Sequence, residues 1–214
     1  MPDKSLLYFR REYLSGTLHR KDLPQDPYQL FMDWIDDAIR SGIDDPTAMS
    51  LATADASGRP SVRIVLLKDA RPEGFVFYSN YESNKGHALA VNPQASVMFF
   101  WPGLDRQVRI EGMVQRTSRE ESDDFFNARP RSACISSIIS QQSKVIADRA
   151  FLEGKFDEFR DLIADSPVKR PDFWGGYILK PDSYEFWQGR ENRLNDRILY
   201  TLIDGNWNIT RLAP

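Results

Sequence analysis

The chain has 214 residues, of which 41% are hydrophobic and 28% charged, and its formal net charge is −3. This composition is that of a globular protein with one good core, and the charge argues against binding nucleic acid or an anionic membrane by bulk electrostatics. One cysteine excludes an intramolecular disulfide, no run approaches 18 apolar residues, and the two histidines form no metal-ligand cluster, so we expect a cytoplasmic protein without a metal.

The first half of the chain predicts an arm, a helix and a set of strands. Residues 1–25 carry charge without a clear period, and we expect them to form an N-terminal arm. Asp26-Pro27 is typical of a helix start and Gly42 of a helix end, with an apolar stripe between them. Strands are then expected over residues 47–55, 61–69, 74–80, 95–102 and 107–117. A short helix capped by Ser83 interrupts them.

The second half predicts helices followed by a return to strands. Ser118 and Glu121 form a capping box, and residues 145–164 have an amphipathic helical pattern. Strands are expected over residues 174–180, 183–189, 197–203 and 207–212, and the last two flank Asp204-Gly205, a strong hairpin signal. We therefore predict an α+β fold, an antiparallel sheet closing into a barrel with surrounding helices, as a single domain over 26–214.

The segment 186–197 combines two aromatic residues with three arginines. Arg190, Arg193 and Arg197 lie close in sequence to Trp187. Arginine binds phosphates and stacks on flat rings, so the segment indicates half of a site for a planar, phosphorylated ligand. A solvated turn with surface charges is the alternative, and these residues alone would favour it.

The run 63–68 places a cation at each end of an apolar strand. Strand alternation sends Arg63, Val65 and Leu67 to one face and Ile64, Leu66 and Lys68 to the other. A regular strand therefore cannot present both cations to one point, although they could serve two parts of a large ligand. The alternative is a core strand with solvated ends.

Further polar groups suit a phosphate or a flavin. Ser79, Ser83 and Lys85, together with the helix start at Ser83, suit a phosphate, although a capped surface helix is an equal alternative. Glutamines such as Gln107 and Gln142 can donate to and accept from a flavin or pyrimidine edge, although surface glutamines are common. The chain shows neither a nucleophile–base arrangement nor a glycine-rich phosphate loop.

In this order and spacing, the motifs resemble those of the pyridoxamine 5′-phosphate oxidases. The motifs are RREY, DLPxDP, DPTAM, RIVLLK, VFYSN, RQV, RPR, QQS, FWGG, EFWQG, RLNDR and RLAP, between Arg10 and Pro214. The resemblance implies a homodimer of FMN-binding split barrels with each flavin at the subunit interface. It implies oxidation of pyridoxamine and pyridoxine 5′-phosphates to pyridoxal 5′-phosphate, with O2 reduced to H2O2, in vitamin B6 biosynthesis and salvage. The alternative is a relative with another substrate, or one that only binds flavin or pyridoxal phosphate.

The resemblance also implies roles for individual residues. Arg63 and Lys85 would hold the FMN phosphate, with Ser79 assisting. The full set implied for the flavin is Arg63, Ile64, Val65, Leu66, Leu67, Lys68, Tyr78, Ser79, Asn84, Lys85, Gln107, Gln142, Ser143, Trp187 and Arg197. The set implied for the substrate is Lys68, Phe125, Arg129, Ala133, Arg193 and Asn195. The set implied around the reacting atoms is Arg10, Tyr13, Asp45, Arg193 and Asn195.

Four positions depart from the family pattern. Phe125 stands where the family has tyrosine, Ala133 where it has serine, Asn195 where it has histidine and Asn84 where it has an arginine. The first two departures each remove a hydroxyl donor, and a lost hydrogen bond to a charged group costs about tenfold or more in affinity. Ser132 could restore one donor after a small loop shift. Asn195 cannot exchange a proton near neutral pH.

Overall fold

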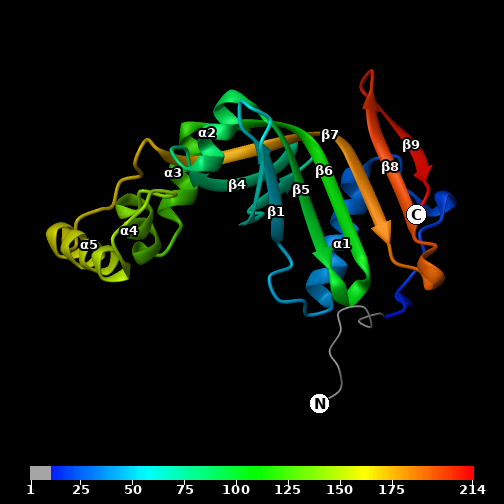
Figure 1. Ribbon diagram of the computed structural model, residues 1–214, viewed down its shortest axis with the longest axis horizontal. Coiled ribbons are helices and arrows are strands. Elements are labelled where there is room, and N and C mark those ends of the chain that lie inside the picture. Colours follow the sequence, from blue (N-terminus) through cyan, green and yellow to red (C-terminus); the bar gives the residue numbers. More distant parts are fainter. Residues whose placement is uncertain (1–10) are drawn as a thin grey trace, which may run out of the picture. The chain divides into compact units, whose positions relative to one another are not determined.

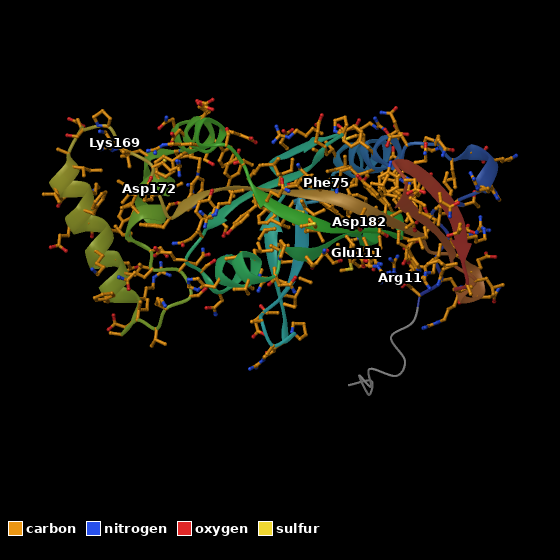
Figure 2. All side chains as sticks on the ribbon, turned by 90° about the horizontal axis from the view of Figure 1, so that it is seen from above. Arg11, Phe75, Glu111, Lys169, Asp172 and Asp182 are labelled. Atoms are coloured by element: carbon orange, nitrogen blue, oxygen red, sulfur yellow. The ribbon has the colours of Figure 1, made fainter. Side chains whose placement is uncertain are left out.

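The computed structural model describes residues 11–214, so the role expected for Arg10 lies outside the described residues. The chain divides into two compact units. The terminal unit comprises the described residues up to Met49, Val97–Ile110 and Asp182–Pro214, and the central unit comprises Ser50–Ser96 and Glu111–Pro181. Figure 2 labels Glu111 and Asp182, where two strands pass from one unit to the other. The expected single domain over 26–214 stays a prediction.

Nine strands form one sheet (Figure 1). Their bounds are β1 (Ala48–Ala54), β2 (Pro60–Leu66), β3 (Asp69–Arg71), β4 (Gly74–Asn80), β5 (Gln94–Trp101), β6 (Arg106–Arg116), β7 (Trp174–Gln188), β8 (Asp196–Ile203) and β9 (Asn206–Leu212). The strand order is β2-β1-β5-β6-β7-β4-β3, and β8 and β9 continue from β7. The pairs β3–β4, β4–β7, β7–β8 and β8–β9 are antiparallel, as expected for the predicted α+β class.

Five α-helices and three short 3₁₀ segments accompany the strands in the described part of the chain. The α-helices are α1 (Pro27–Arg40), α2 (Asn84–Val91), α3 (Arg119–Asn127), α4 (Arg131–Ile139) and α5 (Arg149–Ile163). The 3₁₀ segments are η2 (Arg20–Asp22), η3 (Pro102–Leu104) and η4 (Glu191–Arg193). Within residues 11–214, none of the helices has the length and apolar character needed to cross a membrane.

The terminal unit is built around α1, which begins and ends where the sequence predicts. The Asp26 carboxylate accepts a hydrogen bond from Tyr28 N at 3.0 Å, and this bond caps the helix. Trp34 packs edge-on against Phe186 of β7, with ring centroids 5.2 Å apart. At the hairpin between β8 and β9, Asp204 and Gly205 both have positive φ, 49° and 78°, as the expected two-residue turn requires.

The central unit carries α2 to α5. Ser83 caps α2 through Gly86 N, and Ser118 caps α3 through Glu121 N, as the sequence predicts. The expected capping box is only half formed, because the Glu121 carboxylate accepts a 2.7 Å bond from Arg71 Nη2 instead. The amphipathic face of α5 buries none of its residues, and Leu162 stays 78% exposed.

One expected boundary is wrong: the strands predicted over 174–180 and 183–189 are a single strand, β7, which runs through Pro181. A proline lacks an N–H and normally disrupts a ladder. Here Pro181 falls between two pairings of β7, because β4 pairs with β7 as far as Leu179 and β8 pairs with β7 from Ser183 onward. The strand can therefore continue, since neither of these ladders requires an N–H from Pro181.

Candidate functional site

A cavity of about 700 Å³ opens in the central unit. Strand β2, strand β4 and the helices α2 to α4 supply its walls. The lining residues are Arg63, Ile64, Val65, Leu66, Lys68, Tyr78, Ser79, Lys85, Phe125, Arg129, Pro130, Ser137, Gln142 and Trp174. Most of the residues that the sequence assigns to the flavin or the substrate in this unit therefore surround one space.

Lys85 is the most enclosed cation of the cavity, with only 9% of its surface exposed. Its Nζ donates to Ser79 Oγ at 2.9 Å, to Ser83 Oγ at 3.2 Å and to Gln142 Oε1 at 2.5 Å. Burial, and to a lesser degree the neighbouring charge of Arg63, lowers the pKa of Lys85 to about 8. The positive charge of Arg63 thus disfavours the charged form of Lys85, and a bound anion would favour it.

Arg63 lies on β2 with its guanidinium anchored to neutral oxygens. Its Nη1 donates to Leu51 O at 3.0 Å and to Thr53 Oγ1 at 2.9 Å, and its Nη2 donates to Ser61 Oγ. Burial lowers the pKa of Arg63, although arginine stays charged at any physiological pH. These bonds fix the direction of the guanidinium without neutralising it.

Arg63 and Lys68 line the same cavity, as two cations that serve two parts of a large ligand would. The expectation that they do not meet at one point stays a prediction. The alternation holds along β2, where Ile64 and Leu66 are exposed while Arg63 and Val65 are half-buried. The strand ends at Leu66, before Lys68. Beyond that end, Lys68 N donates to Val76 O of β4 at 2.8 Å.

Arg129 provides the fourth cation. Its guanidinium lies over the Trp174 ring, 4.6 Å from the centroid, and donates through Nη1 to Ser137 Oγ at 2.8 Å and through Nη2 to Ala133 O at 3.2 Å. Burial lowers the pKa of this guanidinium too. A stacked, hydrogen-bonded arginine has few accessible rotamers, so Arg129 is held ready for a ligand.

Three aromatic residues, Tyr78, Phe125 and Trp174, form an aromatic wall of the cavity. Phe125 stacks on Tyr78 with centroids 3.7 Å apart and planes 9° apart, and both rings lie nearly parallel to Trp174. Burial raises the pKa of Tyr78 to about 12, so its hydroxyl keeps its proton at neutral pH. The departure at Phe125 therefore preserves the wall and removes only a hydroxyl.

None of the four cavity cations pairs with a carboxylate among the described residues. Arg63, Lys85 and Arg129 donate only to hydroxyl, amide and carbonyl oxygens. The walls of one cavity thus carry several uncompensated positive charges in a chain whose net charge is −3. Such an arrangement favours a ligand with one or more dianionic groups, such as phosphates.

The remaining predicted residues of the central unit lie beside the cavity. Ser143 has a positive φ of 73°, and its Oγ accepts from Asn84 N at 3.2 Å, so the segment holding Gln142 is tied to the start of α2. Leu67 is buried and supports the wall. Ala133 does not line this cavity, and its carbonyl accepts from Arg129.

Ser137 is a cavity residue that the sequence interpretation missed. The hydroxyl expected from Ser132 is not supported, because Ser132 is exposed and does not line the cavity. Ser137 lies four residues after Ala133 on α4, and that spacing places both on one face of the helix. The signal was present in the sequence, but it requires knowing that residues 131–139 form a helix.

In the terminal unit, two arginines of the segment 186–197 are paired with carboxylates. Arg197 donates through Nε and Nη2 to the buried Glu185, at 2.8 and 3.1 Å, and through Nη1 to Ala213 O. Arg190 Nη1 lies 2.8 Å from Asp196 Oδ2, so Arg190 is an ion-paired arginine. Both arginines hold the segment in place.

The other predicted residues of the terminal unit show different degrees of constraint. Trp187 meets Tyr13 edge-on, with centroids 5.5 Å apart. Asn195 Oδ1 accepts from Arg190 N at 3.0 Å, so the amide fixes the loop. Arg193 is exposed, has a positive φ of 61° and forms no ion pair within residues 11–214.

Asp45 and Gln107 complete the predicted set in this unit. Asp45 has a positive φ of 49°, and its carbonyl accepts from Ala48 N, which closes the turn before β1. Gln107 is half-buried on β6. The ligand roles expected for these residues stay predictions.

Solved structures define the class of fold. PhzG from Burkholderia lata 383, solved with tetrahydrophenazine-1-carboxylic acid, matches with a TM-score of 0.87 and 29% identity over 92% of this chain and 98% of that chain. A pyridoxamine 5′-phosphate oxidase-related, FMN-binding protein from Nostoc punctiforme matches with a TM-score of 0.72 and 17% identity, over 90% of this chain and 100% of that chain. The predicted split-barrel fold is confirmed.

Sequence comparisons define the family. Residues 35–163 match the model described as pyridoxamine 5′-phosphate oxidase, and residues 174–214 match the pyridoxine 5′-phosphate oxidase C-terminal dimerisation region. The pyridoxine/pyridoxamine 5′-phosphate oxidases of Polynucleobacter asymbioticus and Paraburkholderia phymatum are 48% and 51% identical, over 98% of this chain and 99% of theirs. That of Acinetobacter baylyi is 46% identical, over 99% of this chain and 98% of its own. The chain belongs to the pyridoxamine 5′-phosphate oxidase family.

Proposed function

We propose that this chain is a cytoplasmic, FMN-dependent oxidase that forms pyridoxal 5′-phosphate from pyridoxamine 5′-phosphate and pyridoxine 5′-phosphate. The observation that carries the proposal is the cavity whose four cations lack carboxylate partners within the described residues. A flavin mononucleotide and a phosphorylated substrate each bring one phosphate, and the chain offers four cations to balance them. Membership of the family and the identity with oxidases over nearly the whole chain support the same assignment.

FMN would place its phosphate beside Arg63 and Lys85, which both line the cavity. Lys85 already donates to Ser79 and Gln142, so these groups are positioned around the point where a phosphate would compensate both cations. Gln142 carries an amide that can donate to and accept from a flavin. When bound, FMN supplies the two-electron chemistry that accepts electrons from the substrate and passes them to oxygen.

Lys68 and Arg129 would hold the substrate phosphate. Arg129 is stacked on Trp174, so the guanidinium sets the position of the phosphate with little loss of entropy. Oxidation of the amine consumes O2 and water and releases pyridoxal 5′-phosphate, ammonia and H2O2, whereas oxidation of the alcohol releases the aldehyde and H2O2. The residues bind and orient, and the reaction depends less on a general base than hydrolysis would, so asparagine at position 195 should slow it rather than abolish it.

We further propose that the protein is a homodimer with FMN at the subunit interface. The match of residues 174–214 to a dimerisation region supports this assembly. The outer face of β2 also supports it, because Val62 and Ile64 are 68% and 63% exposed and a row of apolar side chains there favours burial against another surface. In that assembly Trp187 and Arg197 would contact the flavin, and Tyr13, Asp45, Arg193 and Asn195 would lie near the substrate.

Steady-state turnover with each of the two substrates tests the proposed function, with the visible spectrum recorded to measure bound flavin. We expect a yellow protein that makes pyridoxal 5′-phosphate and H2O2 in equal amounts. A protein that is saturated with FMN but forms neither product from either substrate would contradict the proposal.

A further inference from the structure

The hydroxyl of Ser137 faces the same cavity as Lys68 and Arg129. Ser137 lies on α4, where its Oγ donates to Ala133 O at 3.0 Å and accepts from Arg129 Nη1 at 2.8 Å. The serine is half-buried and lines the cavity, so a ligand in the cavity can approach it. It is therefore placed between a fixed guanidinium and the space that a ligand would fill.

This hydroxyl can turn toward a ligand without leaving a polar group unpaired. A serine hydroxyl carries one donor and two acceptor lone pairs, and the donor rotates freely about the Cβ–Oγ bond. If the donor leaves Ala133 O, that carbonyl keeps the bond from Arg129 Nη2 at 3.2 Å. The lone pair of Ser137 can continue to accept from Arg129 Nη1. One rotation therefore adds a donor to the cavity at little cost.

We propose that Ser137 is a substrate-binding residue whose hydroxyl donates a hydrogen bond to the substrate phosphate beside Lys68 and Arg129. The identity of that substrate rests on the proposed function. The serine would supply the hydroxyl donor that Ala133 lacks, from one helical turn further along the same face of α4. The weakened phosphate site expected from the sequence is then partly restored by this chain's own residue.

Ser136 is a matched control. It neighbours Ser137 on α4, and its Oγ makes the same kind of bond, to Ser132 O at 2.9 Å. It is exposed and does not line the cavity. Ser136→Ala and Ser137→Ala thus change helix propensity and remove a local hydroxyl bond in the same way. Only Ser137→Ala also removes a donor from the cavity and the oxygen that accepts from Arg129 Nη1.

The experiment compares wild-type protein, S137A and S136A, each loaded with FMN. We expect S137A to raise the KM for pyridoxine 5′-phosphate and the Kd for pyridoxal 5′-phosphate about tenfold, the usual effect of one hydrogen bond to a charged group. The kcat and the affinity for FMN should change little, and S136A should match wild type. Equal constants for S137A and S136A would overturn the proposal.

Two further measurements separate this proposal from its alternatives. Binding of unphosphorylated pyridoxal should be the same in wild type and S137A, and an equal loss for pyridoxal and its phosphate would show that Ser137 only shapes the cavity, which also overturns the proposal. If the wild-type protein forms no product, the proposed function fails. The Kd for pyridoxal 5′-phosphate in S137A and S136A would still decide the role of Ser137.

Discussion

The cavity of the central unit and the segment 186–197 of the terminal unit both concentrate cations, but they treat them in opposite ways. In the segment, Arg190 and Arg197 are paired with Asp196 and Glu185. In the cavity, Arg63, Lys85 and Arg129 donate only to neutral oxygens. The charge of a paired arginine is balanced by its carboxylate, so the pair mainly stabilises the fold. The charge of an unpaired arginine is not balanced within the chain and can attract an anionic ligand. The number of arginines in a stretch therefore says less about binding than their partners do.

The largest effect should come from breaking the pairing in the terminal unit. Glu185 is buried and accepts from Arg197 and Arg109, so Glu185→Ala leaves two guanidinium groups without their partner. We expect the free energy of unfolding to fall by about 3 kcal/mol, as for other broken buried ion pairs. Urea unfolding of the apoprotein measures it, with the exposed Glu111→Ala as control. A loss no greater than that of the control would mean that the pair is not structural.

Removing a cation from the cavity should mainly lower the affinity for a ligand rather than the stability of the fold. Arg63→Met should lower the affinity for FMN about hundredfold, because charged hydrogen bonds to the phosphate are lost. The apoprotein should lose less stability than Glu185→Ala does, since hydrogen bonds to Leu51 O and Thr53 Oγ1 are broken but no ion pair is. Flavin fluorescence titration and urea unfolding measure the two quantities. Arg59→Met is the control, because Arg59 lies next to the same strand but outside the cavity. If Arg63→Met lowered the stability without lowering the affinity for FMN, Arg63 would be a structural cation rather than a ligand-binding one.

The lowered pKa of Lys85 predicts that the affinity for FMN depends on pH, with an effect smaller than that of Arg63→Met. The free site carries a charged Lys85 below about pH 8 and loses that charge above it. Binding of an anionic phosphate therefore needs proton uptake above pH 8, and the affinity for FMN should fall by about tenfold per unit of pH there. Titrations at pH 7 and pH 9 measure the fall. Arginine at position 85 keeps its charge up to pH 9, so Lys85→Arg should lose most of the pH dependence of FMN affinity. An equal fall in affinity in wild type and Lys85→Arg would show that another group causes the pH dependence.

The smallest effect should come from returning a hydroxyl to the aromatic wall. Phe125 lines the cavity and stacks on Tyr78, so Phe125→Tyr can add a donor without altering the stack. We expect the KM for pyridoxine 5′-phosphate to fall by up to about tenfold. The same change at Phe151, an exposed residue of α5, should have no effect. An unchanged KM in Phe125→Tyr would show that its hydroxyl does not reach the phosphate.

Local signals in the sequence predicted most of the fold. Asp26-Pro27 and Asp204-Gly205 act through bonds to adjacent residues, so they predict a helix start and a hairpin without knowledge of the tertiary structure. Pro181 misled the prediction, because its effect depends on where the neighbouring strands end. The second half of the capping box failed for the same kind of reason, since Glu121 found a distant partner in Arg71.

The candidate site was predictable as a set of residues but not as an electrostatic arrangement. Residues from both faces of β2 line the cavity together with Lys68, which lies beyond the end of the strand, and strand alternation alone does not predict this. The partners of Arg197 and Arg63 lie ten or more residues away, at Glu185 and Thr53. Sequence patterns identify cations, but the fold decides which of them are neutralised.

The affinity of the wild-type apoprotein for FMN compared with riboflavin, which lacks the phosphate, tests most directly whether the unpaired cations of the cavity serve a phosphate. We expect FMN to bind at least about a hundredfold more tightly at pH 7, because only FMN can compensate Arg63 and Lys85. Equal affinities for the two flavins would contradict the assignment of these cations to the flavin phosphate.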